Sequence, residues 1–175
     1  MQRIILTYGI IGGLIVAAGM LLSITLVPTG GVAGMVAGYL SMLVALSTVF
    51  VGVKRYRDVE QGGVIRFWPA FGLGLAIAAV AGLIYVLMWE LYMWATDYRF
   101  MEVYAAQYLA ELRADGANAE TLAKAKAAMD KLAVDYANPL IRMPYTFLEI
   151  TPPALLVALL SAAVLRNPRV LPATA

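Results

Sequence analysis

The sequence predicts an all-α, polytopic membrane protein: a four-transmembrane-helix bundle with an extramembrane helical hairpin between the third and fourth spans. The first observation is composition, because 62% of the 175 residues are hydrophobic and only 14% are charged, which is too apolar for an ordinary soluble domain. The second is that four stretches almost without charge are each long enough, at about 1.5 Å per residue, to cross a hydrocarbon core of about 30 Å. The third is a long polar segment that repeats its apolar residues with helical spacing. Residues 1–175 are therefore expected to form a single membrane domain.

The apolar runs and the chain breakers place the elements. The first two spans are expected at about 4–27 and 32–53, separated by the turn Pro28-Thr29-Gly30-Gly31. The first run is too long for a signal-peptide core and lacks a small-residue cleavage site at its end, so we expect it to be a retained helix. The third span is expected at about 69–94 and the fourth at about 143–165.

Small residues recur every four positions on three of the spans, and such spacing lets helix backbones approach closely. The favoured interpretation is tight packing within one subunit; the alternative is a homodimer through these glycine-rich faces. The residues concerned are Gly9, Gly13 and Ala17, then Gly30, Gly34 and Gly38, then Gly74, Ala78 and Gly82.

Basic residues in the short connections predict the orientation. They fall at the N-terminus, in the second connection and at the C-terminus, which four spans place on one side, and the positive-inside rule makes that side cytoplasmic. In the second connection, candidate contacts to lipid headgroups are Lys54, Arg55, Arg57 and Arg66. Positive-inside sorting with snorkelling side chains explains the same residues and is the favoured interpretation.

The segment at about 98–137 is expected to form a hairpin of two amphipathic helices. Gly116 is a natural stop for the first helix, and Asn118 can cap the second, which Asn138-Pro139 ends. No helix breaker occurs between Gly82 and Gly116, so the third span is expected to continue out of the bilayer as one rod. The apolar stripe could pack on itself, on the membrane domain or on a membrane protein partner.

Two carboxylates interrupt the apolar spans near the outer surface, Glu90 in the third and Glu149 in the fourth. Pro152-Pro153 removes two helical hydrogen bonds, so the fourth span should be kinked or broken nearby. Arg142 is the obvious counter-ion for either acid. A structural pairing of Glu149 with Arg142 or with backbone donors is favoured, and a cation, proton or polar-ligand site is the alternative. The candidate ligand-binding residues are Glu90, Glu149, Arg142, Asn138, Tyr145 and Trp89.

Cysteine and histidine are both absent, which removes thiolate chemistry, imidazole bases and nearly all transition-metal sites. We therefore expect no catalytic residues, no metal and no cofactor, and partners that are membrane lipids or a membrane protein rather than nucleic acid. The first functional hypothesis is a non-enzymatic binding or scaffold protein that recognises lipid or a partner at the periplasmic face. The second is a small ion- or proton-coupled transporter that uses Glu90 and Glu149. A membrane enzyme with paired carboxylates ranks last.

Three segments carry a family resemblance: KRYRDVEQGGVIRFWPAF, YVLMWELY and YANPLIRMPYTFLEITP. In this order and at these separations they resemble the bacterial membrane proteins grouped as domain-of-unknown-function family 4199. The likeness covers essentially the whole chain, although Pro153 and Trp68-Pro69 depart from the family pattern. It implies a multi-pass protein of the bacterial inner membrane, with the N- and C-termini cytoplasmic, and it implies no chemistry. The matching positions are Arg57, Asp58, Gly62, Gly63, Phe67, Trp89, Glu90, Asn138, Pro139, Thr146, Phe147, Leu148 and Glu149.

Overall fold

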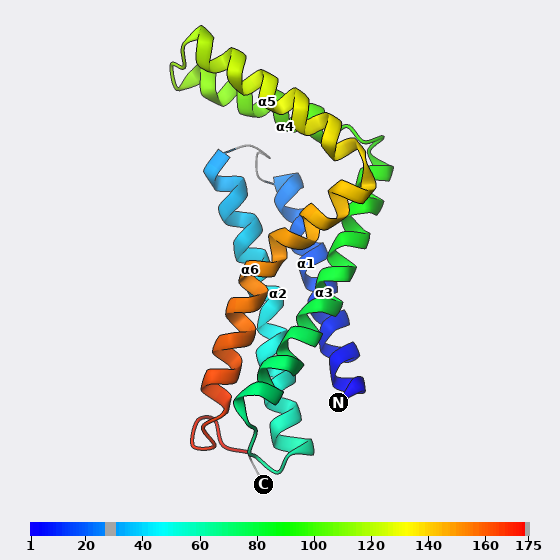
Figure 1. The fold of residues 1–175 in the computed structure, drawn as a ribbon, viewed down its shortest axis with the longest axis vertical. Helices are drawn as coiled ribbons and strands as arrows, with labels where there is room; N and C mark the ends of the chain where they lie inside the picture. Colours follow the sequence, from blue (N-terminus) through cyan, green and yellow to red (C-terminus); the bar gives the residue numbers. More distant parts are fainter. Residues whose placement is uncertain (27–30, 174–175) are drawn as a thin grey trace.

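A computed structural model describes residues 1–26 and 31–173, and all of its regular elements are helical. Four long helices lie side by side and two shorter ones form a hairpin beyond them (Figure 1). The long helices are α1 (Gln2–Leu26), α2 (Gly31–Arg55), α3 (Phe67–Ala95) and α6 (Pro139–Leu165), the short ones are α4 (Phe100–Ala114) and α5 (Ala119–Ala137), and a π-helix η1 (Tyr56–Glu60) extends α2. The predicted all-helical fold with four spans is confirmed, while the predicted turn at Pro28 to Gly30 lies outside the described residues.

The four long helices are each apolar and long enough to cross a membrane. The start of α1 and the segment that follows α6 lie at one end of the four helices, which we name the terminal end (Figure 1). The α4–α5 hairpin leaves α3 and α6 at the opposite end, which we name the hairpin end, and extends to one side (Figure 1). Apolar side chains without exposed surface fill the space between the helices along most of their length, among them Val16, Leu46, Val49, Val53, Ile77 and Ala158.

Small residues bring α1 against α3, as the four-residue spacing predicts. A Cβ atom added to Gly9 would lie 2.5 Å from Cβ of Val80, and one added to Gly13 would lie 2.6 Å from Cβ of Ile84. Helix α3 uses Gly82 in the same way against α6, where an added Cβ would lie 2.9 Å from the Phe147 ring. These glycines are thus used for packing within the subunit.

The expectation that the third span leaves the bilayer as one rod is wrong. Helix α3 ends at Ala95, and Asp97 and Tyr98 take positive φ angles of 50° and 57° before α4 begins. The Thr96 hydroxyl donates to the Tyr92 carbonyl at 2.8 Å, and the Tyr98 amide donates to the Met93 carbonyl at 2.8 Å. These bonds satisfy carbonyls that would otherwise be free at the helix end, so the helix stops without glycine or proline.

Helix α6 continues through Pro144, Pro152 and Pro153. Of the two predicted outcomes, a kink or a break, the break is therefore wrong. The Thr151 hydroxyl donates to the Phe147 carbonyl at 2.8 Å, within the same helix. Proline accepts helical φ angles but removes the amide hydrogen and crowds the preceding turn, which fits the bend along α6 in Figure 1.

Candidate binding site at the hairpin end

Glu90 of α3 and Arg142 of α6 form a two-pronged ion pair. Nε of Arg142 donates to Oε1 of Glu90 at 2.7 Å, and Nη2 donates to Oε2 at 2.5 Å. The third guanidinium nitrogen, Nη1, donates to the backbone carbonyl of Tyr136 at 2.8 Å. Arg142 is only 1% exposed, so this arrangement satisfies a buried cation through all three of its nitrogen atoms.

The same guanidinium lies against two tyrosine rings. Its central carbon is 5.3 Å from the ring centroid of Tyr98 and 5.9 Å from that of Tyr136, within the range of cation–π attraction. Arg142 therefore joins α3, the turn after it, α5 and α6 at the base of the hairpin. This position explains why Tyr98 is held at a positive φ angle that a bulky residue rarely adopts.

Glu149 has a different environment from Glu90. It receives a long hydrogen bond of 3.3 Å from the Tyr85 hydroxyl, and among the described residues no ion pair includes it. The structure thus gives the two carboxylates separate partners. The favoured pairing of Glu149 with Arg142 is therefore wrong, because Arg142 pairs with Glu90, and Glu149 faces a cavity.

This hairpin-end cavity has a volume of about 170 Å³. Helices α1 and α2 contribute small and apolar side chains to its wall, including Met20, Ile24, Gly38 and Met42. The aromatic and acidic part of the wall comes from the other four helices: Tyr85, Trp89, Phe100, Tyr136 and Glu149. Pockets that bind small molecules are typically apolar with a few placed polar groups, and this composition is of that type.

Trp89 supplies a hydrogen-bond donor that is not used. The side chain is 6% exposed, and Nε1 is buried without a hydrogen-bond partner among the described residues. Its ring stacks on Tyr92 at 5.5 Å and meets the edge of Phe100 at 4.7 Å, so it is fixed in place. An unpaired buried N–H costs free energy and calls for a partner.

Tyr136 of α5 lines the same cavity as Trp89. Burial raises the pKa of Tyr136, and interactions with Thr146 and Trp89 oppose part of the rise. Even so, Nε1 of Trp89 makes no hydrogen bond to a described residue. The wall of the cavity thus includes a buried donor without an acceptor.

The other two predicted site residues do not line this cavity. Asn138 caps α6, because its side-chain oxygen accepts a hydrogen bond from the Leu140 amide at 3.0 Å. Tyr145 is 54% exposed on the outside of α6. Of the lining residues, only Trp89 and Glu149 were predicted, and the aromatic residues Tyr85, Phe100 and Tyr136 were not. Tyr85 could have been found, because it lies four residues before Trp89 on the same helix face, whereas Phe100 and Tyr136 depend on how the hairpin folds back.

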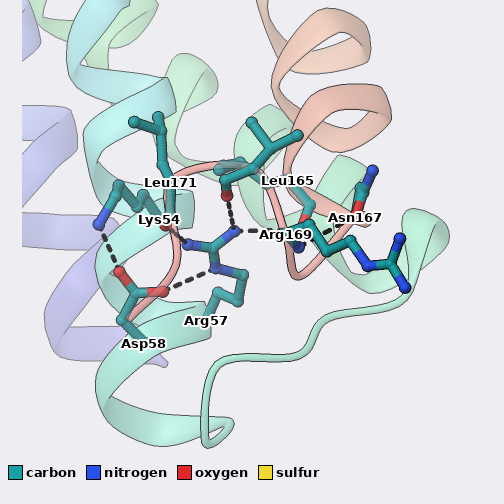
Figure 2. Close-up of polar contacts among 8 residues, drawn as sticks. Lys54, Arg57, Asp58, Leu165, Asn167, Arg169 and Leu171 are labelled. Atoms are coloured by element: carbon teal, nitrogen blue, oxygen red, sulfur yellow. Dashed lines mark hydrogen bonds and ion pairs between the residues drawn. The ribbon is translucent and has the colours of Figure 1, made fainter. Parts of the chain in front are cut away.

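At the terminal end, the basic residues divide into a buried and an exposed set. Arg57 has no exposed surface. It donates through Nε to Asp58 at 2.6 Å, and through its other nitrogens to the carbonyls of Leu165, Val170 and Leu171 (Figure 2). We name these residues the Arg57 cluster; it fastens the segment after α6 to η1.

This arrangement changes the assignment of the candidate headgroup contacts. Arg57 cannot reach a lipid headgroup in this conformation, because its guanidinium is enclosed by protein carbonyls that it satisfies. Lys54 forms an ion pair with Asp58 at 2.5 Å and keeps 33% of its side chain exposed. Arg55 and Arg66 are exposed, so the headgroup prediction now depends chiefly on these two.

The described part of the chain contains no group of three or more His, Cys, Asp or Glu side chains that could hold a metal ion. The all-helical fold, with four helices long and apolar enough to cross a membrane, is that of an α-helical, multi-pass membrane protein. The family described as "Protein of unknown function (DUF4199)" matches residues 7–167, and the chain belongs to this family. Neither the curated proteins nor the solved structures provide a match to the chain.

Proposed function

We propose that this protein is a non-enzymatic binding protein of the bacterial inner membrane, and that the hairpin-end cavity receives part of a lipid or another amphipathic membrane molecule. The observation that carries the proposal is a buried indole N–H without a partner and a carboxylate in the wall of one cavity, whose other lining residues are apolar, aromatic or glycine apart from Ser23 and Ser41. A guest could satisfy both polar groups while its apolar part contacts the methionine and isoleucine side chains of the wall.

The basic residues of the terminal end support an orientation with that end in the cytoplasm. The hairpin and the cavity would then face the periplasmic half of the membrane. In that position, a molecule of the outer leaflet could reach the cavity, and the hairpin would lie in the periplasm.

The alternative of an ion- or proton-coupled transporter has less support. Glu90 is held by Arg142 and is not free to exchange a cation. Towards the terminal end, the space between the helices is filled by side chains without exposed surface, such as Val49, Ile77 and Ala158. Close packing of this kind favours a site that is entered from one side over a path across the membrane.

A cavity-filling substitution tests the proposal. Gly38 lines the cavity, and a Cβ added there would meet no other atom within 4 Å, so Gly38→Leu should fill the space without disturbing the backbone. Gly72 is a matched control, because it is also a helical glycine with nothing within 4 Å of an added Cβ, and it lies on α3 away from the cavity.

We expect the wild-type protein and Gly72→Leu, purified in mild detergent, to retain the same lipid or small molecule in native mass spectrometry. Gly38→Leu should lose it while keeping the same thermal stability. Equal retention by all three proteins would mean that the cavity is not the binding site.

A further inference from the structure

We propose that the group bound in the hairpin-end cavity is an organic ammonium ion that carries an oxygen acceptor beside it. This inference rests on the proposed function, since it names the chemistry of the guest in the same cavity. Three features of the cavity wall support this inference independently: the carboxylate of Glu149, the faces of the aromatic rings and the unpaired indole N–H of Trp89.

Charge is the first feature. Glu149 lines the cavity, and among the described lining residues there is no lysine or arginine. The nearest buried cation, Arg142, already uses its three nitrogens on Glu90 and Tyr136. A carboxylate at membrane depth is costly without a counter-ion; taking up a proton removes that cost, whereas a cationic guest would offset it and leave the carboxylate ionised.

The aromatic wall is the second feature. Tyr85, Trp89, Phe100 and Tyr136 line the same cavity as Glu149. The faces of aromatic rings carry negative electrostatic potential and attract ammonium groups, and tryptophan is the most effective of them. The same faces, together with the carboxylate, would repel the phosphate of a purely anionic headgroup from this position.

The free indole N–H is the third feature, and it specifies the second half of the guest. Nε1 of Trp89 can only donate, so it cannot bind an ammonium and instead requires an oxygen acceptor. Glu149 can only accept when ionised. A guest that satisfies both groups therefore has a donor cation for Glu149 and an acceptor for Trp89.

The size of the cavity limits how much of a molecule can enter. Its volume is about 170 Å³, which is small beside that of a whole phospholipid. This is room for a small polar group and not for an entire lipid. An ethanolamine-type headgroup and a free small amine with a hydroxyl group share the required chemistry.

To test this inference, the protein is reconstituted into nanodiscs that contain equal amounts of phosphatidylethanolamine and phosphatidylglycerol. Native mass spectrometry then measures which of the two lipids remains bound to the protein. We expect the wild type to prefer phosphatidylethanolamine by about tenfold or more, the effect of one charge-assisted hydrogen bond. Glu149→Gln should abolish this preference. Glu111→Gln, which removes an exposed carboxylate on α4, should retain it.

Ethanolamine alone separates the two sources of the ammonium group. Displacement of the retained lipid by millimolar ethanolamine would show that the free amine suffices, whereas retention of phosphatidylethanolamine in its presence would show that the lipid is the guest. If Glu149→Gln does not fold, Trp89→Phe keeps the aromatic ring and removes only the donor, and it should weaken retention of phosphatidylethanolamine by about tenfold.

Two results would overturn the inference in distinguishable ways. If the wild type retains phosphatidylglycerol equally well and Gly38→Leu abolishes retention of both lipids, the cavity binds lipid but the ammonium assignment is wrong. If the wild type retains neither lipid and does not bind ethanolamine, the proposed function fails with it.

Discussion

Replacing Glu90 by leucine should destabilise the protein strongly, because it leaves a buried cation without its partner. Arg142 donates two charge-assisted hydrogen bonds to Glu90, at 2.7 and 2.5 Å. At about 1.5 to 3 kcal/mol each, their loss amounts to about 3 to 6 kcal/mol. This agrees with the cost of about 3 to 5 kcal/mol for removing one partner of a buried ion pair.

Removing the cation instead should cost less. The Glu90 side chain is 17% exposed, against 2% for that of Arg142, so the carboxylate left by Arg142→Met can still reach water. The double variant Glu90→Leu/Arg142→Met removes both charges and should regain much of the stability lost in Glu90→Leu, with a coupling free energy of about 2 kcal/mol or more.

The assay is equilibrium unfolding of the purified protein in mixed micelles with increasing dodecyl sulfate, followed by far-ultraviolet circular dichroism. Glu120→Gln is the control, because it breaks an exposed ion pair between Glu120 and Lys124 on α5, and such pairs contribute at most about 0.5 kcal/mol. The reasoning is refuted if Glu90→Leu shifts the transition no more than the control does, or if the two single effects simply add in the double variant.

Three further predictions concern the Arg57 cluster, the helix contacts and the orientation. Arg57→Met should release the segment after α6 and increase the rate at which added protease cleaves it by about tenfold or more. Arg55→Met, at an exposed position, should leave the cleavage rate unchanged. Equal cleavage rates in the two variants would exclude the role of Arg57 in holding this segment. Gly13→Leu should cost about 1 to 3 kcal/mol through overpacking against α3, measured by the same unfolding assay, and an unchanged midpoint would contradict that contact. The new thiol in Glu111→Cys should react with a membrane-impermeant maleimide in intact spheroplasts. The thiol in Arg169→Cys should react only after the membrane has been permeabilised. The reverse pattern would overturn the proposed orientation.

The fold could be predicted because its causes are local in the sequence. Apolar length sets the spans, and capping residues such as Asn118 set helix starts; the Asn118 side chain does accept from the Thr121 amide at 2.8 Å. The two errors concern where α3 ends and whether α6 is broken at its prolines. The turn after α3 uses Thr96 and two non-glycine residues at positive φ, a combination that has no clear sequence signature.

The candidate site was predicted only in part. The pairing of Arg142 with a carboxylate follows from charge, but the favoured partner, Glu149, was wrong, because the structure pairs Arg142 with Glu90. The cavity could not be predicted, because its wall combines residues from α1 to α6 and includes Phe100 and Tyr136, whose position depends on the hairpin. Arg57 was predicted at the membrane surface, and its burial results from carbonyls more than a hundred residues away.

An experimental structure of the protein in lipid nanodiscs, obtained with a bound antibody fragment to increase its size, tests the central claim most directly. The account predicts density inside the hairpin-end cavity that contacts both the Glu149 carboxylate and Nε1 of Trp89. A cavity closed by protein side chains, with Nε1 of Trp89 donating to the Tyr136 hydroxyl, would contradict it.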